Sequence, residues 1–287
     1  MLAIYKKELK AYFTSMTGYV FISFFLVIIG LYYVVYNMIN KYANFEYVLS
    51  GVSFIFILLV PILTMRLMAE DKKQKTDQLL FTSPLPVSKI IVGKYLAVLT
   101  VFLIVMGVVC LYPLILLQFG SISLSVAYGS ILGFSLLGAA YIAIGLFISA
   151  LTDSQVVAAV VSFIVILLTA LMDSLIGLFP TDNKTAWIIF SVILILICWI
   201  IYVMMHNLTV SLSFGVVCEM GLTVLYFLKP TIFDGLVVRV FDWFSVIARF
   251  NNFITGVLDL SSVIYYISIV FLFLFLTVQA IKKSRWS

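Results

Sequence analysis

The stretch YLAVLTVFLIVMGVVCLYPLILLQFGSISLSVAYGSILGFSLLGAAYIAIGLFISALT, residues 95–152, contains no charged side chain. An α-helix needs about 20 apolar residues to cross a hydrocarbon core about 30 Å thick, so this stretch is too long for one crossing. The Gly- and Ser-containing run from Gln118 to Ser125 interrupts it. The stretch therefore predicts a hairpin of two membrane-spanning helices, at 95–117 and 128–150.

The composition of the whole chain agrees with a membrane protein. Of the 287 residues, 64% are hydrophobic and only 10% are charged, whereas about 25% of a soluble domain is charged. A water-soluble globule is thereby excluded, and the low counts of 15 Gly, 6 Pro and 3 Cys exclude collagen-like, disordered and disulfide-scaffold chains. Cys110, Cys198 and Cys218 lie in apolar runs, so we expect them to be buried small hydrophobes.

Counting the other uncharged runs in the same way predicts an all-α, polytopic membrane protein with about eight transmembrane helices. The predicted spans are 18–39, 48–68, 95–117, 128–150, 155–177, 186–205, 208–228 and 261–281. The run at 208–228 is interrupted by Glu219. It either crosses fully or pairs with its predecessor as a re-entrant unit, which would leave six spans.

The distribution of basic residues predicts the orientation. Of the 17 Lys and Arg residues, 12 lie before residue 11, between 66 and 94, or after 281, and the other 5 lie in the alternate loops. Cytoplasmic loops carry the excess of Lys and Arg. We therefore expect a multi-pass protein of the plasma (inner) membrane with both termini in the cytoplasm.

The N-terminal segment, residues 1–16, has a helical pattern. Apolar residues from Leu2 to Met16 share one arc, and the lysines Lys6, Lys7 and Lys10 share the neighbouring arc. The pattern predicts an amphipathic helix that lies in the cytoplasmic interface of the membrane. Its lysines either only face anionic headgroups or also contact a cytoplasmic partner.

Residues 69–94 form the longest predicted cytoplasmic segment, the only place where we expect a soluble partner to bind. Glu70 and Lys73 have the spacing of a helical ion pair, so the second span can continue into water as a short helix. Ser83, Pro84 and Pro86 end that helix. Three adjacent apolar residues, 79–81, need cover from a partner or from the membrane surface; the alternative is a solvated connector.

Residues 230–259 are predicted to form an external amphipathic segment. Its apolar residues recur at helical spacings of three and four, opposite a polar face, and they predict one amphipathic helix at the outer surface. This helix is either re-entrant or lies flat with Trp243 in the aromatic belt. These residues are Leu236, Val240, Trp243, Phe244, Ile247, Phe250 and Ile254.

Several kinds of catalytic and ligand-binding motif are absent from the sequence. Gly93-Lys94 is followed by Tyr95 and has no glycine five residues upstream, so it is not a phosphate-binding loop. His206 is the single histidine, which excludes an H-E-x-x-H zinc site. We predict no catalytic, cofactor-binding or metal-binding residue in this chain, no ATP hydrolysis by the chain alone, and no binding of nucleic acid.

Glu219 is the predicted intramembrane polar candidate. A charge at the centre of a membrane helix costs about 2.5–3.5 kcal/mol on insertion scales, so such residues usually face protein or a water-filled path. Glu219 is either a hydrogen-bonded carboxyl packed against another helix or a functional proton or cation site.

Taken together, the motifs resemble those of a known family. The amphipathic start IYKKELKAYFTS (4–15), the two-span unit that follows, and the pattern E-x-x-x-x-x-T-x-x-L-L-x-x-x-P leading to I-x-x-G-K resemble the ABC-2 type transporter permeases. The last span and basic tail, Tyr265 to Trp286, are similar to the gliding-motility (GldF-like) branch. The pattern residues are Glu70, Thr76, Leu79, Leu80, Pro84, Ile90, Gly93 and Lys94.

The resemblance covers roughly residues 1–180 and 240–286, and its motif is moderately specific. Two features depart from it: Asp77 follows Thr76 directly, where the family has a Gly-Thr-x-Glu core, and the hairpin 186–228 is additional to the usual six-helix ABC-2 core.

The resemblance implies a single transmembrane permease domain, residues 1–287, in an ATP-driven transporter, by analogy an exporter. Residues 69–94 would be its cytoplasmic coupling segment, with ATPase-coupling residues Glu70, Thr76, Asp77, Leu79, Leu80 and Pro84. The implied partners are an ABC ATP-binding subunit, a second permease subunit in a homo- or heterodimer, and membrane lipid. ATP and Mg would be bound by the partner ATPase and no cofactor by this chain.

A different function class is an ion-coupled secondary carrier or channel that uses Glu219. Against this class, the sequence lacks a second intramembrane charge to pair with Glu219, and it lacks matching Gly- or Pro-broken spans. An intramembrane enzyme is a third class, for which no nucleophile and base are visible. Co-purification of a soluble ATPase separates the first class from the other two.

Overall fold

The computed structural model describes residues 1–76, 85–119, 122–176, 182–205, 208–229 and 233–284. These residues are predominantly helical, and they fall into two compact units, which are considered separately. Unit 1 consists of residues 1–170 and 246–287, and unit 2 consists of residues 171–245.

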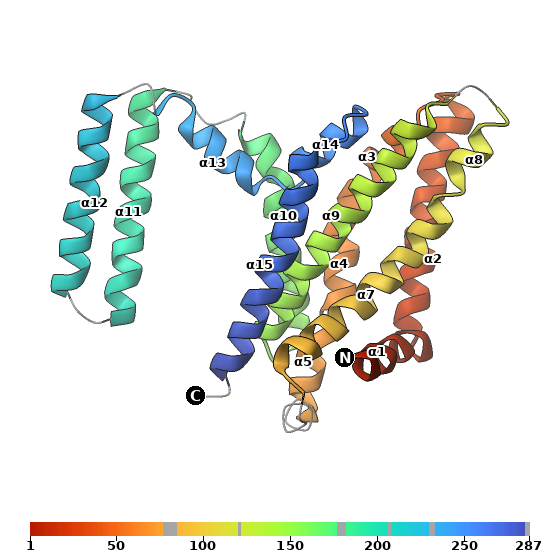
Figure 1. The fold of residues 1–287 in the computed structure, drawn as a ribbon, viewed down its shortest axis with the longest axis horizontal. Helices are drawn as coiled ribbons and strands as arrows, with labels where there is room; N and C mark the ends of the chain where they lie inside the picture. The colour runs from red at the N-terminus through yellow and green to blue at the C-terminus, as the bar shows by residue number, and fades with distance from the viewer. Residues whose placement is uncertain (77–84, 120–121, 177–181, 206–207, 230–232, 285–287) are drawn as a thin grey trace. The chain divides into compact units, whose positions relative to one another are not determined.

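Unit 1 contains the N-terminal helices and the last two helices of the chain (Figure 1). Its elements are α1 (Leu2–Thr14), α2 (Met16–Tyr33), the π-helix η1 (Val34–Ile39), α3 (Glu46–Val52), the 3-10 helix η2 (Ser53–Ile55), α4 (Phe56–Thr64), α5 (Arg66–Lys73), α7 (Val87–Val109), α8 (Tyr112–Leu116), α9 (Leu124–Leu151), α10 (Gln155–Ile176, whose last turns belong to unit 2), α14 (Ala248–Ile254) and α15 (Leu260–Ser284).

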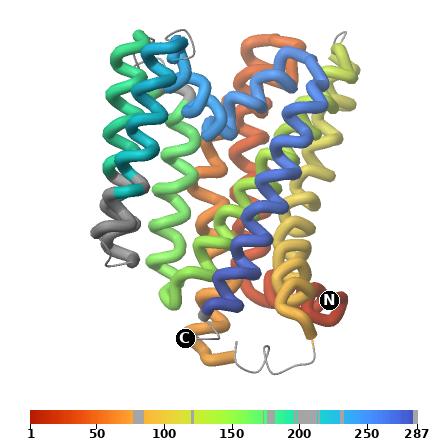
Figure 2. The backbone as a smooth tube through the Cα atoms, turned by 60° about the vertical axis from the view of Figure 1, so that its left-hand side comes forward, coloured from red at the N-terminus to blue at the C-terminus, as the bar shows by residue number. Residues whose placement is uncertain are grey.

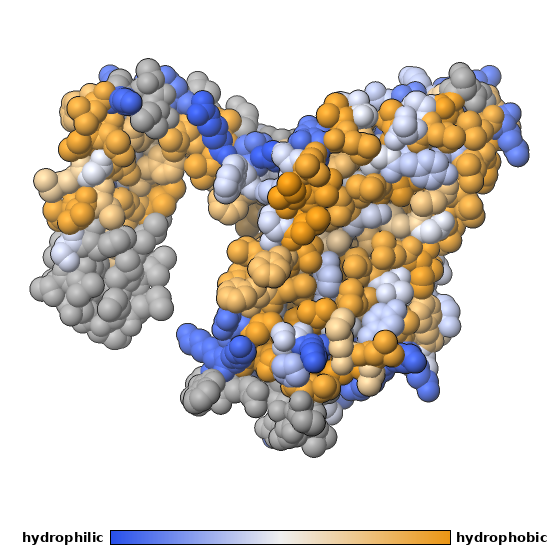
Figure 3. Space-filling view, viewed as in Figure 1, coloured by the Kyte–Doolittle hydropathy of each residue, from blue (hydrophilic) through white to orange (hydrophobic). Residues whose placement is uncertain are grey.

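Six helical stretches among the described residues are long and apolar enough to cross a membrane. They are Met16–Ile39, Glu46–Lys73, Val87–Leu116, Leu124–Leu151, Gln155–Met172 and Leu260–Lys283. They coincide with six of the predicted spans. On the visible face of unit 1, hydrophobic side chains cover the middle and hydrophilic ones gather toward the two ends (Figure 3).

The third span begins earlier than the predicted residue 95. Pro86 is the N-cap of α7, and the helix continues from Val87 to Val109 without interruption. Val87, Ile90 and Ile91 are buried, so the face that packs in the membrane segment already starts at the first turn. The residues directly after Pro86 are therefore the beginning of the span itself.

Helix α9 is the centre of unit 1 and contacts α3, α4, α5, α7, α14 and α15 (Figure 2). Its glycines let neighbouring side chains approach its backbone, a common arrangement in membrane helices. Gly133 faces the Phe253 ring, Gly138 faces Phe102, and Gly145 faces Thr64. Around it, the rings of Phe25, Phe56, Phe102, Phe134 and Tyr141 form a continuous aromatic core.

Unit 2 contains a helical hairpin and one further helix. Its elements are α11 (Asn183–Met205), α12 (Leu208–Leu228) and α13 (Leu236–Phe244). Where the structure describes side chains, α11 and α12 contribute the apolar stretches Asn183–Ile195 and Gly215–Leu228, and only those parts of the two helices enter the count of candidate spans. That these two helices cross the membrane, giving eight spans, stays a prediction.

The segment 230–259 forms two short helices, α13 and α14, and the expectation of one amphipathic helix was wrong. Ser245 ends α13 in an extended conformation, and its N–H bonds to the carbonyls of Phe241 and Asp242. The next residue, Val246, accepts a hydrogen bond from the Tyr266 hydroxyl at 2.9 Å. The extended conformation of Ser245 ends the helix, and the Tyr266 bond fixes the chain that follows against α15.

The packing on α9 predicts that replacing two glycines by alanine has different effects on stability. A Cβ at Gly133 would lie 2.5 Å from Cγ of the fully buried Phe253, whereas a Cβ at Gly107 would meet nothing within 4 Å. Because the ring cannot swing away, Gly133→Ala should destabilise the protein by about 1–3 kcal/mol. Gly107→Ala should be neutral or stabilising by up to about 1 kcal/mol. Thermal unfolding of the purified variants in detergent measures both, and equal melting temperatures would contradict this packing.

Candidate functional site

A buried lysine connects three helices at one end of unit 1. Lys94 of α7 is only 1% exposed, and its Nζ lies 2.8 Å from Oε1 of Glu8 in α1 and 2.6 Å from Oδ2 of Asp71 in α5. The same Nζ donates a hydrogen bond to the carbonyl of Leu67 at 2.7 Å. The ammonium thus donates hydrogen bonds to Glu8 and to the Leu67 carbonyl and is ion-paired with Asp71, which compensates a group that is costly to bury alone.

The sequence of α7 brings this charge into the interior. Val87, Ile91, Lys94, Val98 and Val101 follow one another at spacings of three and four, and all are buried. The lysine therefore occupies a position of the apolar face. Buried charges are tolerated when they are paired, so the face requires acidic side chains from neighbouring helices.

Gly93 permits the close approach of α1. A Cβ at this position would lie 3.2 Å from the Met1 carbonyl and 3.4 Å from Ile4, which is itself buried. At the other end of α1, the buried Tyr12 hydroxyl donates to the Leu63 carbonyl at 2.8 Å. Burial, with a smaller effect of the Glu8 carboxylate, raises the pKa of Tyr12, so the hydroxyl keeps its proton and remains a donor.

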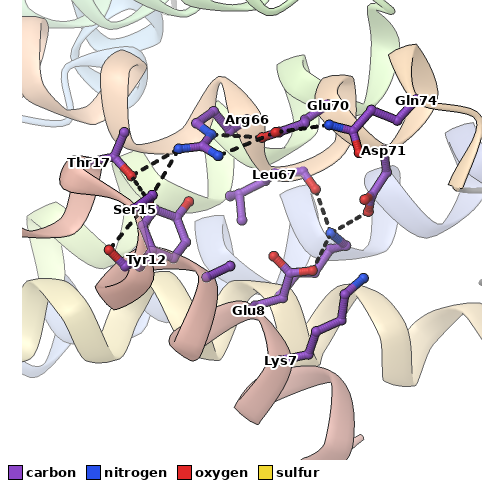
Figure 4. A pocket seen from close by; sticks show the side chains of 12 residues that line it. Lys7, Glu8, Tyr12, Ser15, Thr17, Arg66, Leu67, Glu70, Asp71 and Gln74 are labelled. Atoms are coloured by element: carbon purple, nitrogen blue, oxygen red, sulfur yellow. Dashed lines mark hydrogen bonds and ion pairs between the residues drawn. The ribbon is translucent and has the colours of Figure 1, made fainter.

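Arg66 of α5 forms a second polar contact in the same part of unit 1 (Figure 4). Arg66 makes a two-pronged ion pair with Glu70, with Nε to Oε2 at 2.7 Å and Nη2 to Oε1 at 3.3 Å. It also donates to the hydroxyls of Ser15 and Thr17 at the junction of α1 and α2. Both charge clusters line one cavity of about 170 Å³ between α1 and α5.

The short helix α5 is also attached to the end of α9. The Ser149 hydroxyl accepts hydrogen bonds from the N–H groups of Met68 and Ala69 and donates to the carbonyl of Met65. These are groups that the break between α4 and α5 would leave unpaired. Lys72 donates to the Ala150 carbonyl at 2.7 Å, a favourable place for a cation because α9 ends there.

The structure brings two of the predicted coupling residues into this network. Glu70 is paired with Arg66 and not, as the spacing suggested, with Lys73. The Thr76 hydroxyl donates to Oδ1 of Asp71 at 3.1 Å, so it supports the carboxylate that holds Lys94. The coupling residues Asp77, Leu79, Leu80 and Pro84 lie outside the described residues.

The predicted residues of the interfacial helix lie on α1, and Glu219 lies in unit 2. Lys6, Lys7 and Lys10 are exposed, and Lys7 lines the cavity beside Glu8. Glu219 is a half-buried residue of α12 whose Oε2 is buried without a hydrogen-bond partner in the described part of the chain.

Sequence reasoning missed the role of Lys94, Glu8 and Asp71. Lys94 was counted as one of the cytoplasmic charges of the loop, although its spacing from Ile91 and Val98 places it on the buried face of α7. That spacing was the available signal. Glu8 is the single acid of the N-terminal helix, among three lysines, which marks it as the partner.

Comparison with known families agrees with the resemblance. The profile of the ABC-2 family transporter proteins matches residues 36–193, more than half of the chain. The chain belongs to this family. Curated proteins give no match.

As an ABC-2 permease, the chain is a non-catalytic, multi-pass membrane subunit. ABC-2 permeases work with ATP-binding subunits, and ATP is hydrolysed by the partner ATPase in such systems. Within the ranges that the structure describes, no group of three or more His, Cys, Asp or Glu side chains could hold a metal ion. The family match includes α5, Lys94 and the segment between them, and it leaves out α1.

The buried ion pairs of Lys94 predict that Lys94→Met strongly lowers the stability of the permease. Removing one partner of a buried ion pair costs about 3–5 kcal/mol, because here Glu8 and Asp71 would face each other uncompensated. The control is Lys89→Met on the exposed side of the same helix, which should change stability by less than about 0.5 kcal/mol. Thermal unfolding in detergent measures the difference.

A second variant separates the charge pair from simple loss of packing. Adding Glu8→Gln and Asp71→Asn to Lys94→Met removes the two unpaired carboxylates and should restore a large part of the lost stability. If the triple variant is less stable than the single one, the carboxylates do not act through Lys94.

Proposed function

We propose that the segment 69–94 of this permease couples the motion of an ABC ATP-binding subunit to the membrane helices, in an ATP-driven exporter. The observation that carries the proposal is the contact between Asp71 and Lys94, at 2.6 Å. It joins the helix that enters the segment to the helix that leaves it.

A coupling element must transmit a displacement without absorbing it. Lys94 holds α5 against α7 and, through Glu8, against α1, while Ser149 and Lys72 hold α5 against α9. Breaking the buried Lys94 contacts costs several kcal/mol. A force applied to the segment is therefore expected to move these helices as one body, as alternating access requires.

The residues proposed to meet the ATPase are Glu70, Thr76, Asp77, Leu79, Leu80 and Pro84. Two of them are already bound within the protein: Glu70 is paired with Arg66, and Thr76 donates to Asp71. We assign to Glu70 and Thr76 the role of holding the segment in position, and to the apolar residues after them the contact with the partner subunit.

The remaining parts of the proposal rest on charge distribution and on the resemblance. Both termini and the segment are placed in the cytoplasm of a plasma (inner) membrane protein because basic residues concentrate there. Export, a second permease subunit, Mg-ATP on the partner and a position near the gliding-motility branch follow from the family resemblance. The spans alone do not name the transported molecule.

An ion-coupled role for Glu219 is the second candidate. The observation that favours it is the buried, unpartnered Oε2 of this carboxyl in α12. Purification of the native complex distinguishes the two: a permease of the proposed kind retains a soluble ATPase through residues 70–94, and an ion-coupled carrier does not.

The proposed contact with the ATPase predicts that shortening two leucines of the segment weakens binding of the ATPase. The double variant Leu79→Ala, Leu80→Ala should lower co-purification of the ATPase and ATP hydrolysis by the complex at least about tenfold, because adjacent apolar anchors contribute several kcal/mol to an interface. The control is Leu258→Ala, Leu260→Ala, two exposed leucines next to α15, which should leave both measurements unchanged. Normal ATPase retention by the first variant would remove the coupling assignment.

The ion pair between Arg66 and Glu70 allows a sharper test of the role of Glu70. Glu70→Lys should reduce ATP-driven transport while the protein still inserts into the membrane. Exchanging both charges, with Arg66→Glu and Glu70→Lys, restores the internal ion pair. If Glu70 acts by holding the segment, the exchange should restore transport; if Glu70 binds the ATPase directly, it should not.

The orientation can be tested with single cysteines. In a chain with Cys110, Cys198 and Cys218 changed to alanine, Gln118→Cys should react with a membrane-impermeant maleimide on intact cells. Gln74→Cys should react only after lysis. Both glutamines are exposed, so accessibility within the protein is matched. Labelling of position 74 on intact cells would place the segment outside and end the coupling proposal.

A further inference from the structure

A second cavity is lined by residues from η1 and the loop after it, from α8 and from the start of the α9 region. In Figure 1 these segments lie at the opposite end of unit 1 from α1 and α5. Its volume is about 380 Å³, within the roughly 300–1,000 Å³ of ligand pockets. It is lined by Asn37, Met38, Lys41, Tyr42, Ala43, Leu116, Phe119 and Ile122.

Asn37 brings a buried, unsatisfied acceptor to this cavity. Its side chain is 6% exposed, and its Nδ2 donates to the carbonyls of Tyr42 at 2.6 Å and Asn44 at 3.4 Å. Because both neighbours are acceptors, the orientation of the amide is fixed with nitrogen toward them. Oδ1 then has no hydrogen-bond partner among the described residues. This buried acceptor is therefore left for a donor from outside the chain.

The backbone holds this arrangement in an unusual geometry. Asn37 lies in the π-helix η1, a type of turn that is rare and frequent at functional sites. Lys41 follows with a φ of +57°, the left-handed region that non-glycine residues seldom adopt. The two features curl the chain from 37 to 44 into a closed loop around the Asn37 amide, with the Lys41 and Tyr42 side chains at the cavity.

The lining identifies the chemistry of an occupant. Lys41 supplies a cation and Tyr42 a hydroxyl, a pair suited to a phosphate. Asn37 Oδ1 requires an N–H or O–H donor close to that phosphate. Phe119, which is 70% exposed, offers apolar surface, and the buried Leu116 lies at the wall of the cavity. Lysine and tyrosine at the end of a span lie where lipid headgroups lie.

We propose that this cavity binds the headgroup of a phospholipid whose phosphate is next to an ammonium donor, of the phosphatidylethanolamine class. The ammonium donates to Asn37 Oδ1, the phosphate contacts Lys41 and Tyr42, and the first part of an acyl chain covers Phe119. Phosphatidylcholine has the same phosphate and the same positive charge but no N–H group, so the site discriminates against it. This site is independent of the coupling segment.

The test uses the purified full-length chain and lipids with identical acyl chains. Native mass spectrometry measures how much of each lipid the protein retains from mixed micelles. The series is phosphatidylethanolamine, its N-methyl and N,N-dimethyl derivatives, and phosphatidylcholine. Retention should persist while one N–H group remains and fall about tenfold at phosphatidylcholine, the step in which the last donor is lost. Equal retention of all four lipids would overturn the proposal.

One variant localises the effect without endangering the fold. Lys41→Gly removes the cation and suits the left-handed backbone, so it should keep or raise the melting temperature while lowering retention of phosphatidylethanolamine. Lys184→Gln, an exposed lysine in unit 2, is the control and should change nothing. A preference that survives Lys41→Gly, or displacement of the lipid by free phosphoethanolamine at equal concentration, would contradict a lipid site here.

Discussion

The fold of unit 1 depends on the need to neutralise one buried cation. Lys94 lies among apolar residues of α7, where an unpaired ammonium would be several kcal/mol unfavourable. Its acceptors come from α1, from α5 and from the Leu67 carbonyl. A buried pair is weak evidence for added stability, but it specifies one arrangement of these helices over others. The N-terminal helix is positioned by this requirement as well as by its apolar face.

The rest of the packing makes that arrangement possible. Glycines on α9 allow Phe102, Thr64 and Phe253 to approach its backbone, and Gly93 does the same for α1 on α7. The close approach of α1 at Gly93 brings Glu8 to 2.8 Å from Lys94. A small residue and a charge, adjacent in the sequence, thus act together.

Long uncharged runs predicted the six candidate spans well, because the thickness of a membrane fixes the length of a crossing. The contacts of the site were harder to predict. Assigning Lys94 to solvent followed from its charge, whereas its helical spacing indicated burial. The pairing of Glu70 with Arg66 could not be distinguished from pairing with Lys73 by spacing alone. The break at Ser245 is accompanied by the bond between Val246 and Tyr266, a contact across 20 residues that no local pattern contains.

The hydroxyl of Ser149 has a mechanical consequence. It pairs backbone groups on both sides of the break at Met65. Such a joint resists bending, because one oxygen is bonded to α4 and to α5 at once. A displacement of α5 is therefore expected to carry α4 and α9 with it.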